Sequence, residues 1–179
     1  MGSVQNAFSF LIETLIHLYL VALLLRILLE AIRADFYNPI CQVLIRVTDP
    51  VVKPLGRIIP HLGPVNIAAL LVLYLLQLIG LFILAAMAGI SPDPLVLAVL
   101  ALRRLVRMLL ILYLVLIIIG VILSWVGQGF RHPLVPLIFQ LTEPVLAAIR
   151  RVMPNLGGLD LSPLVAIIGI QFLIILLGV

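Results

Sequence analysis

The chain has 179 residues, of which 65% are hydrophobic and only 10% are charged. Soluble domains average about 45–50% and about 25%, so this composition excludes an ordinary soluble globular protein. The net charge is +4, and the single cysteine, Cys41, excludes an intramolecular disulfide and a cysteine-rich metal site. The composition therefore predicts an integral membrane protein.

Four apolar stretches are long enough to cross the hydrocarbon core, which takes about 20 helical residues. They cover approximately 8–32, 65–88, 105–126 and 161–178. The start of the chain has no positively charged region and no cleavage site of small residues, so we expect the first stretch to be a retained helix and not a signal peptide. The sequence therefore predicts an all-α membrane protein with four transmembrane helices.

The two halves align without a gap when the sequence is shifted by 94 residues. Shared Pro, Thr, Gly, Arg and Gln in one register indicate duplication. A Thr-acid-Pro motif recurs as Thr48, Asp49 and Pro50 and as Thr142, Glu143 and Pro144. We therefore predict two repeats, 1–90 and 91–179, each with a proline-bounded loop (33–64 or 127–160) between two spans. Two spans return the chain to its starting side, so the repeats should be parallel, related by an axis along the membrane normal.

Each loop is predicted to carry two short helices separated by the Thr-acid-Pro corner. Threonine suits an N-cap, the acid suits the positive end of a helix, and proline suits the first turn. Before the first corner, the helical spacing places these residues on one face: Ile40, Val43, Leu44 and Val47. Cys41, Gln42 and Arg46 should then point away from that face. An ordinary loop with two turns of helix is the alternative.

After the second corner the pattern is typical of an interfacial amphipathic helix. Its apolar arc consists of Val145, Leu146, Ile149, Val152 and Met153. In the first copy Pro54 and Gly56 should shorten or kink the helix, so the second copy is predicted to be the better membrane-surface binder. Asp160 or Ser162 is expected to cap the last span, and Asn66 the second.

The basic residues of the two loops are candidates for binding anionic lipid head groups or a protein partner. They are Arg46, Lys53, Arg57, Arg150 and Arg151. Because these loops carry more Arg and Lys than the opposite side, the positive-inside rule predicts that they are cytoplasmic and that both termini lie outside.

The second loop and its flanks resemble a known family. The residues are a Ser-Trp at the end of a span, Thr-Glu-Pro, a dibasic pair, and Gly-Gly-Leu-Asp-Leu-Ser-Pro. Together with the duplication, they are similar to the YggT family of bacterial membrane proteins, also called YlmG. The family's arginine is present in the first copy as Arg26, but Gly120 replaces it in the second, and Glu30-Ala31 stands where Ser124-Trp125 does. The resemblance implies an inner-membrane protein linked with cell division, envelope organisation, assembly of membrane complexes or osmotic stress tolerance, without a defined catalytic set.

Polar side chains inside the spans are candidate functional residues, because they are costly there. Glu13 and His17 are one helical turn apart and are expected to share a hydrogen bond, with proton or ion handling as the alternative. Gln77 and Gln171 are equivalent in the repeats and should either join helices or line a path. Arg26 and its neighbour Glu30 are expected at the membrane interface, with the arginine snorkelling toward it.

The sequence holds no catalytic signature that we recognise, such as H-E-x-x-H, G-x-S-x-G or a phosphate-binding glycine loop. The first hypothesis is therefore a non-enzymatic organising or assembly factor that needs no cofactor or metal and does not bind nucleic acid. Its expected partners are the anionic membrane surface, a membrane protein and a second copy of the chain. The second hypothesis is a potassium or proton conduit between the two halves.

Overall fold

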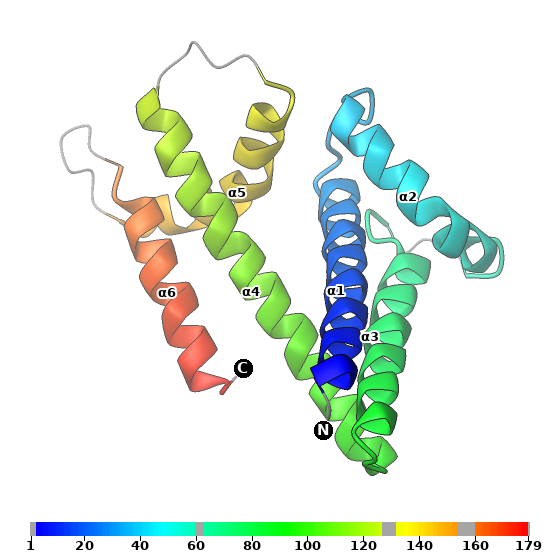
Figure 1. Ribbon diagram of the computed structural model, residues 1–179. Coiled ribbons are helices and arrows are strands. Elements are labelled where there is room, and N and C mark those ends of the chain that lie inside the picture. Colours follow the sequence, from blue (N-terminus) through cyan, green and yellow to red (C-terminus); the bar gives the residue numbers. More distant parts are fainter. Residues whose placement is uncertain (1–2, 60–62, 127–131, 154–159, 179) are drawn as a thin grey trace.

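The computed structural model describes residues 3–59, 63–126, 132–153 and 160–178 (Figure 1). Six helices lie within these residues. They are α1 (Ser3–Ala31), α2 (Pro39–Gly56), α3 (Ile67–Met87), α4 (Pro94–Val126), α5 (Leu134–Arg150) and α6 (Ser162–Leu176).

Three of these helices, α1, α3 and α4, are long and apolar enough to cross a membrane. The fourth predicted span forms helix α6, but α6 has only 15 residues and is about 22 Å long. Four full-length spans were therefore an overestimate. Helix α4 begins eleven residues before the predicted boundary, because Asp93 Oδ1 accepts hydrogen bonds from the backbone N–H groups of Leu95 and Val96, at 2.7 and 3.3 Å. Arg103 and Arg104, which precede the predicted span, thus lie within the helix.

The helices repeat in the same order in both halves. Helix α1 packs on α3 as α4 packs on α6, and α2 covers α1 and α3 as α5 covers α4 and α6. The halves meet mainly where α3 lies along α4, with a smaller contact between α1 and α5. Helices α2 and α5 lie toward one end of the molecule, and the start of α1 and the end of α6 lie toward the other (Figure 1).

Each predicted helix pair is in fact one continuous helix. Helix α2 has 18 residues with Pro50 and Pro54 inside it, and α5 has 17 residues with Pro144 inside it. The first copy is therefore not shorter than the second. Pro50 and Pro144 are exposed, and so are the residues four positions before them, Arg46 and Gln140. Because proline has no N–H, the carbonyl group four residues before it loses its helical hydrogen bond. On the exposed side of the helix, that carbonyl can bind water instead.

The two motif threonines are therefore not N-caps. The hydroxyl of Thr48 donates a hydrogen bond to the carbonyl of Leu44, 2.6 Å away, and that of Thr142 donates to the carbonyl of Ile138, 2.9 Å away. Both side chains are buried. This bonding to the preceding turn is a known alternative for threonine inside a helix and is associated with bending.

The actual helix starts lie at other polar residues. Asn38 caps α2, accepting a hydrogen bond from the Ile40 N–H at 2.9 Å, and Asn66 caps α3, as predicted, by accepting one from the Ala69 N–H at 3.0 Å. Asp160 accepts a hydrogen bond from the Ser162 N–H at 2.9 Å at the start of α6. Hydrogen bonding to Ser162 lowers the pKa of the Asp160 carboxyl.

The start of α2 also joins the two halves. The Asn38 side-chain amide donates a hydrogen bond to the carbonyl of Pro133, 2.7 Å away and just before α5. A buried apolar cluster contains residues from both halves, among them Leu29, Cys41 and Leu137. Cys41 is therefore buried, and the prediction that it points away from the apolar face is wrong. The face of α2 that packs on the protein is the one that carries Cys41, Thr48 and Val52.

Candidate functional site

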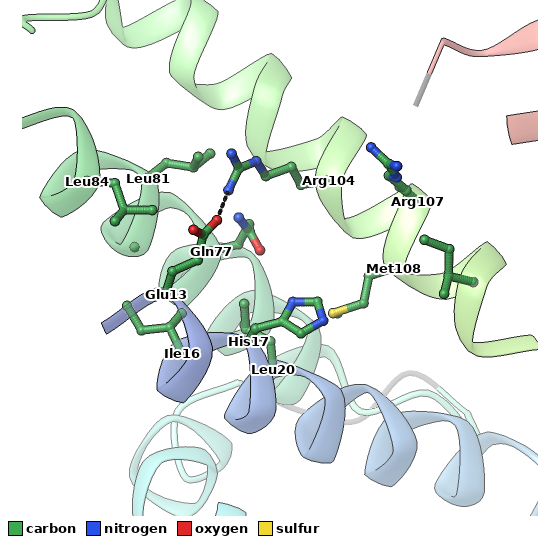
Figure 2. Close-up of a pocket in the computed structure, with 12 residues that line it drawn as sticks. Glu13, Ile16, His17, Leu20, Gln77, Leu81, Leu84, Arg104, Arg107 and Met108 are labelled. Atoms are coloured by element: carbon green, nitrogen blue, oxygen red, sulfur yellow. Dashed lines mark hydrogen bonds and ion pairs between the residues drawn. The ribbon is translucent and has the colours of Figure 1, made fainter. Parts of the chain in front are cut away.

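A polar pocket of about 420 Å³ lies between α1, α3 and α4 (Figure 2). Its polar lining consists of Glu13 and His17 from α1, Gln77 from α3, and Arg104 and Arg107 from α4. Apolar residues such as Leu20 and Met108 complete the wall. Three of the four predicted intramembrane polar residues are thus brought together.

The contacts inside this pocket differ from those predicted. Glu13 Oε1 accepts a hydrogen bond from Arg104 Nη1 at 3.3 Å in an ion pair, and no hydrogen bond joins Glu13 to His17 in the described part of the chain. Gln171 is not in the pocket, because it lies exposed on α6. Neither arginine was among the predicted site residues, because only the packing of α4 against α1 and α3 brings them into the pocket. In the structure, Arg104 and Arg107 lie within the spanning helix α4 and place two positive charges there.

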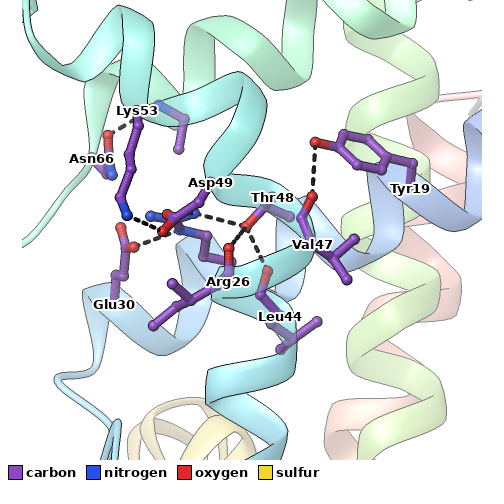
Figure 3. A network of polar contacts seen from close by, with 11 residues as sticks. Tyr19, Arg26, Glu30, Leu44, Val47, Thr48, Asp49, Lys53 and Asn66 are labelled. Atoms are coloured by element: carbon purple, nitrogen blue, oxygen red, sulfur yellow. Dashed lines mark hydrogen bonds and ion pairs between the residues drawn. The ribbon is translucent and has the colours of Figure 1, made fainter.

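A second polar site, the arginine cluster, joins α1 to α2 (Figure 3). Arg26 is 8% exposed. Its Nη1 donates hydrogen bonds to Thr48 Oγ1 at 2.7 Å and to Asp49 Oδ1 at 2.8 Å, and its Nε donates to Glu30 Oε1 at 2.8 Å. Lys53 Nζ lies 2.7 Å from the second oxygen of Asp49. The cluster therefore contains two cations and two carboxylates.

Arg26 does not snorkel to the membrane surface, as had been predicted from its position near the end of the span. The Thr48–Asp49 pair of α2 covers it, so its charge is neutralised within the protein. Burial alone would raise the pKa of the Asp49 carboxyl, but the hydrogen bonds from Lys53 and Arg26 outweigh burial and lower it. Removing one partner of a buried ion pair leaves the other charge uncompensated, at a high cost in free energy. The pairing of Arg26 with Asp49 therefore holds α2 against α1.

The second copy keeps the motif but not this bond. Gly120 replaces Arg26, and Ile138 lies beside it. Glu143, the counterpart of Asp49, pairs with Arg150 at 2.6 Å between exposed side chains, and Arg150 also lies 3.9 Å from Asp160. The motif therefore builds a buried link in one repeat and a surface ion pair in the other.

Helix α2 presents two distinct exposed faces besides its buried one. Arg46, Lys53 and Arg57 recur at intervals of seven and four residues and lie on one side. The neighbouring exposed face is apolar and carries Val43, Val47 and Val51. We call these the basic face and the valine face of α2.

Helix α5 uses more of its predicted apolar arc inside the protein than α2 does. Val145, Leu146 and Ile149, which were predicted to face the lipid, pack against the cluster of Ile117, Ala166 and Ile170. Arg151 is exposed, as predicted. Val152 of the same predicted arc is 87% exposed, so only part of the arc is left for the membrane surface, and stronger surface binding by the second copy stays a prediction.

Neither site has the chemistry of a metal centre. Within the described residues, no group of three or more His, Cys, Asp or Glu side chains could hold a metal ion. The pocket combines two guanidinium groups with one carboxylate, an imidazole and an amide, which suits ionic hydrogen bonding.

Comparisons with known proteins agree with this architecture. A model of the CCB3/YggT family matches the chain twice, at residues 5–87 and 99–179. An uncharacterized protein of Vibrio alginolyticus is 46% identical over 97% of this chain and 95% of its own length. The uncharacterized protein YggT of Escherichia coli K12 is 39% identical over 92% of this chain and 85% of its own. No solved structure matches. The chain therefore belongs to the CCB3/YggT family, with one family unit in each half.

Proposed function

We propose that this chain is a non-enzymatic organising or assembly factor of the bacterial inner membrane. It acts through α2 and α5, which lie on the cytoplasmic membrane surface and bind anionic lipids and a membrane protein partner. The observation that carries this proposal is the pairing of the basic face with the valine face on α2.

These two faces match the two layers of a membrane surface. A helix lying in the interface buries apolar side chains at the boundary of the acyl chains and directs Lys and Arg toward the head groups. The valine face supplies the apolar contact, and Arg46 and Arg57 are exposed beside it. Each basic group near an anionic surface contributes about 1 kcal/mol, so these two side chains favour anionic over zwitterionic lipid.

The arginine cluster supports the same function by holding α2 in place. Because Arg26 bonds Thr48 and Asp49 on the side of α2 that packs on the protein, the outer faces keep a fixed orientation toward the membrane. A rigidly presented surface binds with less loss of conformational entropy than a mobile loop. The buried charge thus serves positioning rather than catalysis.

A second candidate function is ion transport through the polar pocket. It is favoured by one observation, the gathering of Glu13, His17 and Gln77 with two arginines between three helices. A symmetric path through both repeats is less favoured, because Gln171 lies outside the pocket.

Tryptophan fluorescence tests the placement of α2. In a Trp125→Phe background, Val47→Trp puts the only tryptophan on the valine face. After reconstitution into vesicles, brominated lipids should quench it, and brominated phosphatidylglycerol should quench it more than brominated phosphatidylcholine at the same mole fraction. Arg46→Glu with Arg57→Glu should remove this preference. Arg33→Glu changes an arginine that is also exposed but lies outside the basic face, so it is the matched control and should keep the preference.

The same variants test partner binding in cells. Photo-crosslinking from position 46 should capture a membrane protein, and Arg57→Glu should reduce that product while Arg33→Glu does not. If the tryptophan of the Val47→Trp variant is exposed to water and neither lipid quenches it, the interfacial placement of α2 is refuted. Potassium and proton flux should be measured in the same vesicles, beside Gln77→Leu. Flux that Gln77→Leu abolishes would favour the transport function instead.

A further inference from the structure

The two halves of the chain meet through a packed interface between α3 and α4. Leu81 of α3 packs against Leu97 and Ala101 of α4, with Tyr74 and Leu78 beside them. The Tyr74 hydroxyl donates a hydrogen bond to the carbonyl of Ala98, 3.3 Å away. We call this contact the inter-repeat interface.

On α4, this interface continues as a regular stripe toward the first half. Leu105, Met108 and Leu112 pack in the cluster formed by α1, α2 and α3. Together with Ala98 and Ala101, which contact α3, they form a stripe of Ala98, Ala101, Leu105, Met108 and Leu112. These positions alternate between steps of three and four residues, which is the spacing of a helix–helix seam.

The counterpart of each side of this interface is uncovered. On α6, the positions equivalent to Tyr74, Leu78 and Leu81 are Ile168, Phe172 and Ile175, which are 60%, 60% and 77% exposed. On α1, the stripe equivalent to that of α4 is Val4, Ala7, Leu11, Thr14 and Leu18. Its three large apolar residues, Val4, Leu11 and Leu18, are 67%, 52% and 61% exposed. Both halves of a second such interface are thus present in the chain and face away from it.

Gln171 points to the same missing contact. Its counterpart Gln77 is buried at the junction of α1, α3 and α4, whereas Gln171 is exposed on an otherwise apolar helix. An amide that faces hydrocarbon without a hydrogen-bond partner is costly. Gln77 and Arg107 line the same pocket, and the counterpart of Arg107 in the repeat is Glu13. Glu13 pairs with Arg104 through one carboxylate oxygen and is half exposed, so it can also accept a hydrogen bond from the Gln171 amide of a second copy.

We propose that α6 of one copy packs against the N-terminal half of α1 of a second copy, repeating the inter-repeat interface between molecules. Because two different surfaces meet, the contact is head-to-tail, and it either closes into a ring or continues along the membrane. The interface is independent of the lipid binding proposed above. It adds to that function, because it places the basic faces of α2 in neighbouring copies side by side.

Paired cysteines test this contact directly. In a Cys41→Ser background, Ala7→Cys with Phe172→Cys should give disulfide-linked dimers and higher species when native membranes are oxidised before detergent is added. Leu78→Cys with Ala101→Cys places the same pair in the inter-repeat interface and should close within one chain. Ala7→Cys with Ala166→Cys is the negative control, because Ala166 is buried against α4 of its own chain.

Each outcome decides for or against the proposal. Dimers from the Ala7–Phe172 pair, absent from the Ala7–Ala166 pair, support it. Monomers from the Ala7–Phe172 pair, while the Leu78–Ala101 pair closes, overturn it, and so does failure of the Leu78–Ala101 pair, because the template contact is then absent. Equal dimer formation by Phe172→Cys alone overturns the head-to-tail arrangement in favour of a symmetric contact between two α6 helices.

A gain of affinity gives an independent check. Ile168→Tyr restores the tyrosine that Tyr74 supplies in the inter-repeat interface and places its hydroxyl near the carbonyl of Val4 in the second copy. Association in vesicles, followed by energy transfer between labelled copies, should strengthen about threefold, the factor for an average interhelical hydrogen bond in a membrane. Ile168→Phe keeps the ring without the hydroxyl and should lack this gain. An equal effect of both substitutions contradicts the predicted hydrogen bond.

Discussion

Arg26 and Thr48 are 22 residues apart in sequence, yet Nη1 of the arginine donates a 2.7 Å hydrogen bond to the threonine hydroxyl inside the protein. The same hydroxyl donates to the Leu44 carbonyl of its own helix. Thr48 thus links the charge of α1 to the backbone of α2. Its counterpart Thr142 makes the helical bond without an arginine, so the two repeats provide matched controls for each other.

Removing the guanidinium should destabilise the fold strongly. Arg26→Met leaves Glu30 and Asp49, both largely buried, without their main counter-charge, and loss of one partner of a buried ion pair costs about 3–5 kcal/mol. We expect the free energy of unfolding in detergent to fall by an amount in this range. Arg33→Met, at an exposed arginine, should change it little. Equal losses in the two variants would contradict the role of Arg26.

The two motif threonines should differ in their contribution to stability. Thr48→Val removes a hydrogen bond from a charged donor, which contributes about 1.5–3 kcal/mol. Thr142→Val removes only a bond to a helical carbonyl, so its cost should lie near the lower end of about 0.5–1.5 kcal/mol. Thermal unfolding of the two purified variants measures the difference. A larger loss at Thr142 would show that the hydroxyl acts mainly through its own helix.

Stability should depend on acid through Asp49. Its carboxyl pKa is lowered in the folded protein, so the unfolded chain binds the proton more readily, and the stabilisation is complete above the unfolded pKa of about 4. It is lost as the pH falls through the folded pKa. The difference in melting temperature between the wild type and Asp49→Asn should be constant from pH 7 to about 5 and shrink below about pH 4. A difference that grows on acidification would contradict this assignment.

Two glycines in the spanning helices should respond differently to a methyl group. A Cβ at Gly80 would lie 3.2 Å from Ile16 Cγ2, whereas one at Gly120 would lie 3.7 Å from Ile138 Cγ2. Gly80→Ala should therefore lower the free energy of unfolding by about 1 kcal/mol or more. Gly120→Ala should be neutral or stabilising by up to about 1 kcal/mol.

The origin of the Gly80 effect can be checked with a second substitution. Ile16→Ala removes both atoms that would crowd the new methyl group, Cγ2 at 3.2 Å and Cδ1 at 3.3 Å. The double variant should lose less stability than the sum of the two single variants, because the contact is shared. Additive losses would exclude this close approach as the cause.

The sequence alone predicted the elements that depend on local pattern. Apolar length located α1, α3, α4 and α6, and the 94-residue register identified equivalent positions in the two halves. The cap at Asn66 followed from its side chain and the apolar run after it. These features require no knowledge of distant contacts.

The errors came from contacts between distant segments. Thr48, Asp49 and Pro50 have the residue types of a helix start, but the hydroxyl bond to Leu44 and the bond from Arg26 keep them inside a continuous helix. Similarly, the pocket needs α4 to bring Arg104 next to Glu13, which helical spacing within one segment cannot reveal. The asymmetry between Gln77 and Gln171 has the same origin, because α3 lies along α4 and α6 has no helix after it within the described chain.

The length of α6 has a consequence for the surrounding bilayer. Its 15 residues give about 22 Å of helix, whereas α3 with 21 residues gives about 32 Å and the hydrocarbon core is about 30 Å thick. A bilayer that matches α3 on one side of the molecule is too thick for α6 on the other. Hydrophobic mismatch of this kind is relieved by local thinning, so we expect shorter acyl chains beside α6 than beside α3.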